Sequence, residues 1–240
     1  MTENDAAGRI IIALDAKSGR EGLEMAGRLD AARIFKVGLE LFTAEGPGFL
    51  ENLRGSGKEI FLDLKLHDIP NTVAGAVRSG ARHGVRMMTL HTAGGSAMMA
   101  AAAAAAREAS ELEGTVRPLL LGVTILTSLK EDDLAEIGMN ASVEDQVLRL
   151  AGLARAAGLD GVVCSPREIE AVRRESGPDF LIVTPGIRPA GADVQDQKRI
   201  MTPEKAVALG ADYLVIGRPI TAAPYPAEAL RNIAAAIRPK

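Results

Sequence analysis

The stretch at 60–72 combines an apolar run with closely spaced charges, and its residue types are those that acid–base chemistry uses. Side chains alternate faces along a strand, so Asp63 and Lys65 are expected to point the same way at the end of a buried strand. Asp68 follows beyond the expected strand end, which gives the local charge order minus, plus, minus. Such a cluster is typical of a catalytic site with shifted pKa values, but also of a structural ion pair at the rim of a barrel.

Strands and helices alternate along the chain and must position these charges. Apolar runs predict eight strands, at 9–14, 32–37, 59–65, 86–91, 118–126, 161–164, 180–184 and 213–216. Helical spacing predicts helices at 18–29, 43–53, 73–83, 96–109, 142–157 and 226–237, with a further helix opening at Pro166. Apolar strands followed by helices favour an α/β fold, a single-domain (β/α)8 TIM barrel over residues 1–240, rather than an open doubly wound sheet.

The carboxyl ends of the predicted strands carry most of the unusual polar side chains. Functional groups of parallel barrels lie at these ends. Here they are Asp15, Lys36, Asp63, Lys65, His91, Thr127 and Arg218. Any one of them could simply form hydrogen bonds with the polar groups of a loop, but their coincidence at one rim predicts an active site.

The loops after the seventh and eighth predicted strands suit a phosphate group, because such loops commonly bind phosphates in these barrels. Gly217 lets the backbone approach an anion closely, and Arg218 offers a planar fork that matches phosphate oxygens. The loop at 185–199 is longer than a plain connection, and its glycines predict a lid. A disordered surface insertion is the alternative for this loop.

Composition and charge argue against several functions. The net charge of -3 and the pI of about 5.7 offer no basic field for nucleic acid or an anionic membrane. A single cysteine, Cys164, no long apolar run and an acidic N-terminus predict a cytoplasmic protein. The histidines His67, His83 and His91 lack the paired spacing of metal ligands, and no phosphate-cradling nucleotide loop is present. We therefore expect neither a metal nor an organic cofactor.

Motifs along nearly the whole chain resemble the orotidine 5'-phosphate decarboxylase family, which makes uridylate. The pattern Asp-x-Lys-x-x-Asp-Ile-Pro-Asn-Thr at 63–72 is similar to the family signature. Further matches follow in order at 12–15, 35–38, 126–128, 184–189, 196–199 and 216–219. The resemblance implies decarboxylation of orotidine 5'-phosphate to uridine 5'-phosphate, the last step of de novo UMP biosynthesis, without a cofactor.

The resemblance also implies roles for individual residues. Substrate would be bound by Asp15 and Lys36 at the ribose hydroxyls, Thr127 at the pyrimidine edge, and Arg188, Gln197, Gly217 and Arg218 around the phosphate. An alternating charge network would consist of Lys36, Asp63, Lys65 and Asp68. The enzyme would be a homodimer with shared sites, in which Asp68 and Thr72 come from the partner subunit.

The reaction explains why such charges would be needed. Loss of carbon dioxide from C6 of the pyrimidine leaves negative charge on that carbon, which must be stabilised and then protonated. Lys65 would do both, because neighbouring Asp63 and Asp68 keep its amine protonated. Asp63 would also contact the substrate carboxylate, and preorganised charge would favour the anionic transition state.

Two alternatives remain open. The barrel and the Asp-x-Lys-x-x-Asp motif also resemble ketogulonate-phosphate decarboxylases and hexulose-phosphate synthases, which use magnesium. The Ile-Pro-Asn-Thr continuation, the motif at 126–128 and Gln197 favour the nucleotide enzyme, and dependence on added magnesium would discriminate the two. The other alternative is a catalytically silent barrel that binds a phosphorylated ligand as a regulator. Binding of a uridylate analogue without turnover would support it.

Overall fold

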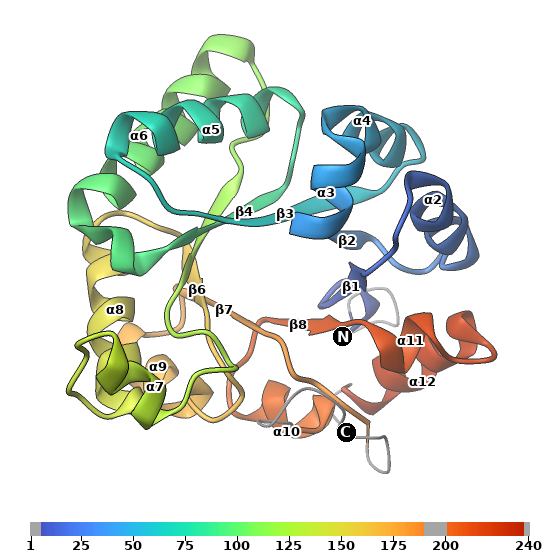
Figure 1. Cartoon of the computed structure of the whole chain (residues 1–240). Helices are drawn as coiled ribbons and strands as arrows, with labels where there is room; N and C mark the ends of the chain where they lie inside the picture. The colour runs from blue at the N-terminus through green and yellow to red at the C-terminus, as the bar shows by residue number, and fades with distance from the viewer. Residues whose placement is uncertain (1–5, 190–200, 238–240) are drawn as a thin grey trace.

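Eight parallel strands close into a barrel in the computed structural model, which describes residues 6–189 and 201–237 (Figure 1). Each strand pairs with its neighbour in sequence, and the eighth pairs with the first. The strands are β1 (Ile10–Leu14), β2 (Ile34–Gly38), β3 (Glu59–Leu66), β4 (Met87–His91), β5 (Leu119–Val123), β6 (Gly161–Val163), β7 (Leu181–Thr184) and β8 (Tyr213–Ile216). The predicted single-domain (β/α)8 barrel is therefore confirmed.

The helices surround this ring of strands (Figure 1). They are α2 (Gly19–Arg28), α3 (Leu39–Glu45), α4 (Pro47–Gly55), α5 (Pro70–Arg82), α6 (Gly95–Glu113), α7 (Glu131–Glu136), α8 (Val143–Ala156), α9 (Ile169–Ser176), α10 (Pro203–Ala208), α11 (Arg218–Thr221) and α12 (Pro226–Ala236), with a 3-10 turn, η1 (Thr92–Gly94). Local sequence explains several starts: Ser18 and Ser142 accept backbone hydrogen bonds as N-caps, and proline stands in the first turn of α5 and α12. No helix in this part of the chain is long and apolar enough to cross a membrane.

Two apolar layers hold the barrel together. Side chains such as Ile11, Phe61 and Val215 form one buried cluster inside the ring of strands. Ile10 and Ile12, which alternate with Ile11, belong instead to the larger cluster that includes the helices. The interior is thus a packed core, and only the ends of the strands are available to a ligand.

Several element boundaries differ from those predicted. The helix expected at 43–53 is divided into α3 and α4 at Gly46, whose φ of 67° favours glycine. The prediction that Pro166 opens a helix is wrong, since α9 begins at Ile169 after a turn. The short helices α7, α10 and α11 were not predicted, because four to six residues show too little periodicity.

Candidate active site

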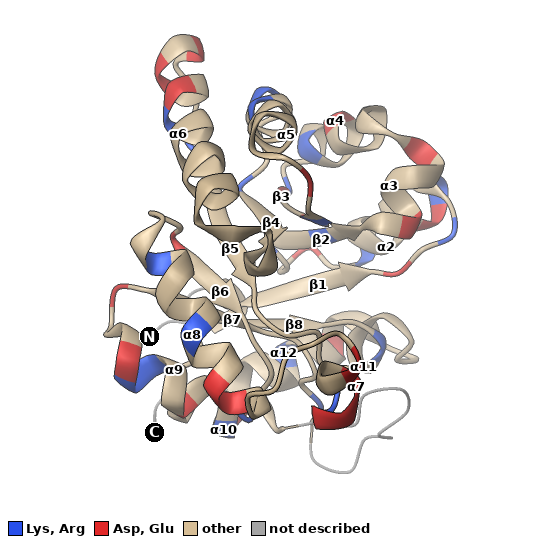
Figure 2. Cartoon of the chain, turned by 60° about the vertical axis from the view of Figure 1, so that its left-hand side comes forward, with Lys and Arg blue, Asp and Glu red and all other residues tan. Residues whose placement is uncertain are grey.

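A cavity of about 280 Å³ lies at the carboxyl ends of the strands. Its inner wall is apolar and includes Val123 together with Phe61 and Val215, which belong to the barrel core. Its polar lining includes eight of the predicted site residues: Asp15, Lys36, Asp63, Lys65, Thr127, Arg188, Gly217 and Arg218. Figure 2 shows α7 and α11 near this end of the barrel, toward which the β1 arrow points.

Four of these side chains form an alternating series of charges. The Lys65 ammonium lies 2.9 Å from Asp63 Oδ2, and the Lys36 ammonium lies 3.7 Å from the same oxygen. Lys36 Nζ is also 3.9 Å from Asp15 Oδ1. Asp63 and Lys36 are largely buried, so their mutual attraction is screened less than it would be at the surface.

The environment of Asp63 favours its charged form. Burial raises the pKa of this carboxyl, but the charges of Lys36 and Lys65 and hydrogen bonds from Lys65 and Thr89 outweigh that effect. The net result is a pKa below the ordinary value of 3.8. Asp63 is therefore an anion at neutral pH, and its charge attracts both ammonium groups.

Thr89, on β4, belongs to the same network and was missed by sequence reasoning. Its hydroxyl donates a hydrogen bond to Asp63 Oδ1 at 2.9 Å and accepts one from the backbone N–H of Lys65 at 2.9 Å. A polar residue inside an apolar strand, two positions before the rim residue His91, was the available signal.

The backbone at Lys65 has an unusual conformation. Its φ is 51°, and it is the one residue other than glycine with a positive φ in the described parts of the chain. The pairing of β3 with β4 shifts register between Leu62 and Leu66, which brackets Lys65. Left-handed conformations of residues with side chains cost about 1–3 kcal/mol and cluster at functional sites. Lys65 thus reaches Asp63 from an irregular strand end, where a regular strand was expected.

Asp68 and Thr72 lie apart from this network within their own chain. Both are exposed, and neither lines the cavity. Asp68 Oδ1 accepts a hydrogen bond from the backbone N–H of Ile69 at 2.7 Å. Thr72 stands in the first turn of α5. A single chain therefore places three of the four predicted network residues together, without Asp68.

The predicted phosphate end of the cavity is closely built. A Cβ atom added to Gly217 would lie 3.1 Å from Asp15 Oδ2, so a larger residue would crowd this carboxylate. Arg218 begins α11, and the buried Arg188 also lines the cavity. Gln197 and most of the loop predicted to form a lid, residues 190–199, lie outside the described residues.

Two histidines lie at the side of the network. The rings of His67 and His91 have centroids 5.6 Å apart. Burial, followed by the proximity of His67 and Lys65, lowers the pKa of His91 below its ordinary value. Within residues 6–189 and 201–237, no group of three or more His, Cys, Asp or Glu side chains is arranged to hold a metal ion.

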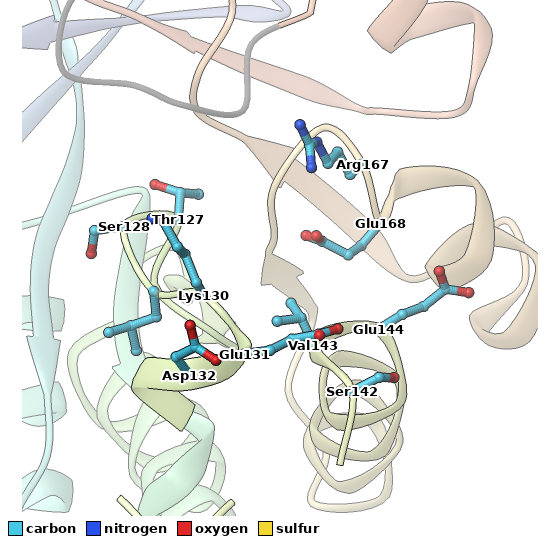
Figure 3. Close-up of a pocket in the computed structure, with 11 residues that line it drawn as sticks. Thr127, Ser128, Lys130, Glu131, Asp132, Ser142, Val143, Glu144, Arg167 and Glu168 are labelled. Atoms are coloured by element: carbon cyan, nitrogen blue, oxygen red, sulfur yellow. The ribbon is translucent and has the colours of Figure 1, made fainter. Parts of the chain in front are cut away.

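A second, wider groove of about 710 Å³ adjoins the cavity and shares Thr127 with it. Figure 3 shows Thr127 and Ser128 on one side of the groove and Arg167 and Glu168 on the other. Its charged lining consists of Lys130, Glu131, Asp132, Glu144, Arg167 and Glu168. Acidic groups outnumber basic ones there, whereas the smaller cavity has more cations than carboxylates. The smaller cavity is therefore the better site for an anionic ligand.

The fold and the site together define a (β/α)8 barrel enzyme for a small anionic substrate. The chain belongs to the orotidine 5'-phosphate decarboxylase / HUMPS family, which matches residues 8–233. It is 54% identical over 239 residues to the orotidine 5'-phosphate decarboxylase of Moorella thermoacetica, covering 99% of this chain and 95% of that protein. It is 52% identical over 230 residues to the corresponding protein of Actinobacillus succinogenes, covering 95% and 97%.

A solved structure agrees with these sequence comparisons. The crystal structure of orotidine 5'-phosphate decarboxylase from Lactobacillus acidophilus matches with a TM-score of 0.87 and 38% identity. The match covers 97% of this chain and all of that one. The family predicted from the sequence motifs is confirmed.

Proposed function

We propose that this protein converts orotidine 5'-phosphate to uridine 5'-phosphate and carbon dioxide, the last step of de novo UMP biosynthesis, without a cofactor. One observation carries the proposal: the ammonium of Lys65 lies 2.9 Å from the buried carboxylate of Asp63, in a cavity that Arg188 and Arg218 also line. The 54% identity to a relative named as this decarboxylase supports the choice of substrate.

The cavity suggests one orientation of the substrate. The phosphate would bind at the end formed by Arg188, Gly217 and Arg218, with Gln197 from the adjoining loop. The ribose hydroxyls would contact Asp15 and Lys36, and the pyrimidine would lie against the apolar wall with its polar edge at Thr127. This orientation directs C6 of the ring toward Lys65, because Lys65 stands at the opposite end of the charge series from Asp15.

The reaction then breaks the bond between C6 and its carboxylate. Carbon dioxide leaves, and the bonding electron pair remains on C6. The Lys65 ammonium stabilises this charge and transfers a proton to C6, which forms the new C–H bond and leaves a neutral amine for reprotonation from solvent. Asp63 and Lys36 are positioned before the reaction begins, so stabilising the transition state requires little reorganisation.

The active site would be completed across a two-fold dimer interface. Asp68 is exposed and outside its own cavity, although it follows the strand that carries Asp63 and Lys65. Its neighbour Ile69 is 68% exposed, and Leu39 at the start of α3 is 57% exposed. Apolar side chains exposed beside the strand ends suit burial against a second subunit, which would bring in Asp68 and Thr72 of that subunit.

Product analysis tests the proposed function. Purified protein is incubated with orotidine 5'-phosphate and EDTA, and the nucleotide product and released carbon dioxide are quantified. Equal amounts of uridine 5'-phosphate and carbon dioxide are expected. Product formation only after magnesium is added would favour the chemistry of the sugar-phosphate relatives. Tight binding of uridine 5'-phosphate without any turnover would instead identify a phosphate-binding barrel with no decarboxylase activity.

A further inference from the structure

Thr89 connects the two charged residues at the centre of the site. It is fully buried on β4. Its hydroxyl donates to Asp63 Oδ1 and accepts from the backbone N–H of Lys65, both at 2.9 Å. A hydroxyl offers a single donor hydrogen, and here that hydrogen is directed at the Asp63 carboxylate. One buried side chain therefore fixes the direction of the Asp63 carboxylate and the position of the Lys65 backbone.

The Lys65 backbone needs such support. With a φ of 51° it adopts the left-handed conformation, which persists in a residue with a side chain only where the surroundings hold it. The register of β3 against β4 shifts between Leu62 and Leu66. Within this irregular segment, the Lys65 N–H finds its acceptor in the Thr89 side chain. The hydrogen bond to Thr89 thus stabilises the Lys65 backbone where β3 departs from regular pairing with β4.

We propose that Thr89 is a positioning residue for the decarboxylation. It directs Asp63 Oδ2 toward Lys65 by holding Oδ1, and it keeps Lys65 in the conformation that places the ammonium in the cavity. Thr89 does not line the cavity itself, so it acts through Asp63 and Lys65 and not by contacting the substrate. The inference rests on the proposed function and adds a residue to its machinery.

Isosteric substitution separates this role from simple packing. Thr89→Val replaces the hydroxyl by a methyl group of similar size and removes both hydrogen bonds, while Thr89→Ser keeps the hydroxyl. Thr92 provides a matched control, because it is also fully buried and its hydroxyl donates to the Val123 carbonyl at 2.9 Å. Thr92→Val therefore loses a comparable buried hydrogen bond that involves neither Asp63 nor Lys65.

The expected results concern kcat. Thr89→Val should lower kcat by roughly 10- to 100-fold, the effect of a small displacement of reacting groups. KM should change by less than about threefold, since the substrate contacts remain. Thr89→Ser should restore most of kcat, and Thr92→Val should lower the urea midpoint but not kcat. A Thr89→Val enzyme with the wild-type kcat, or an equal loss of kcat in Thr92→Val, would overturn the proposal.

A second measurement is independent of turnover. The hydrogen bond from Thr89 stabilises the charged form of Asp63, so its removal should raise the pKa of this carboxyl in a carbon-13 NMR titration. An unchanged pKa would refute the positioning role even if wild-type protein had no decarboxylase activity, a result that would separately refute the proposed function. If Thr89→Val does not fold, Thr89→Ala replaces it. Failure of both to fold beside a folded Thr92→Val would show that Thr89 serves the fold instead.

Discussion

Lys65 and Asp63 are separated by one residue in sequence, and their charged groups lie 2.9 Å apart although the backbone between them is not regular. The left-handed conformation of Lys65 places the ammonium within reach of the carboxylate at the cavity wall. Lys36 adds a second cation 3.7 Å from the same Asp63 oxygen. The charge that would stabilise a carbanion is thus assembled before any substrate binds.

Arg218→Ala should weaken the binding of substrates that carry a phosphate far more than the binding of the nucleoside orotidine. Loss of a charge-assisted, bidentate contact costs about 2–4 kcal/mol in the free energy of binding. Because remote binding energy helps to order the site, kcat/KM should also fall. Kinetics with orotidine 5'-phosphate and with orotidine measure the difference. Arg167→Ala, in the neighbouring groove, is the control and should leave kcat/KM for both substrates unchanged. Equal losses for the two substrates would exclude a phosphate contact.

Gly217→Ala should impair binding through Asp15. The new methyl group would stand 3.1 Å from Asp15 Oδ2, so this carboxylate, whose Oδ1 lies 3.9 Å from Lys36 Nζ, must shift from its present position. An increase in KM of about tenfold, equivalent to roughly 1.4 kcal/mol, is expected. Gly48→Ala in α4 is a matched control, because nothing lies within 4 Å of its added Cβ atom. An unchanged KM in Gly217→Ala would show that the Asp15 carboxylate does not contact the ribose.

The lowered pKa of Asp63 predicts a pH dependence of stability. A carboxyl group with a lower pKa in the folded protein binds fewer protons there, so it stabilises the fold above its unfolded pKa. This contribution is lost as the pH falls from about 3.8 through the folded value. Asp63→Asn should therefore lose less free energy of unfolding than wild type between neutral pH and pH values below about 4. Urea midpoints measured across this pH range follow the loss of stability in each protein. Parallel curves of midpoint against pH for the two proteins would contradict the lowered pKa of Asp63.

Subunit mixing tests the shared active site. If Asp68 completes the site of the partner, a dimer of one Lys65→Ala and one Asp68→Ala chain has one site with both lesions and one intact site. Random exchange of equal amounts gives half mixed dimers, so roughly a quarter of wild-type activity should return. Mass spectrometry of differently tagged chains confirms that exchange has occurred. An exchanged mixture that remains inactive would show that Asp68 serves its own chain.

The sequence predicted the barrel because apolar strands and amphipathic helices alternate along the chain, and it predicted the charged rim because parallel strands end at one face. It did not predict Thr89, since a threonine is ordinary in a strand and its partners lie on a different one. The left-handed conformation of Lys65 was also hidden, because lysine has no preference for it. The charge pattern singled out Asp68, but its place in the site of the partner subunit was predicted from the resemblance alone, and a single chain leaves it exposed.

The central claim is that Lys65 stabilises and protonates C6 during decarboxylation. The most direct test follows the pyrimidine absorbance of orotidine 5'-phosphate in EDTA with wild-type protein and with Lys65→Ala, alongside uridine 5'-phosphate binding to each. Wild type should turn over, and Lys65→Ala should fold and bind the nucleotide but lose at least about 10²-fold in kcat, the contribution expected of one general acid. A Lys65→Ala protein that retained more than about a tenth of the wild-type kcat would contradict the role of Lys65 as proton donor.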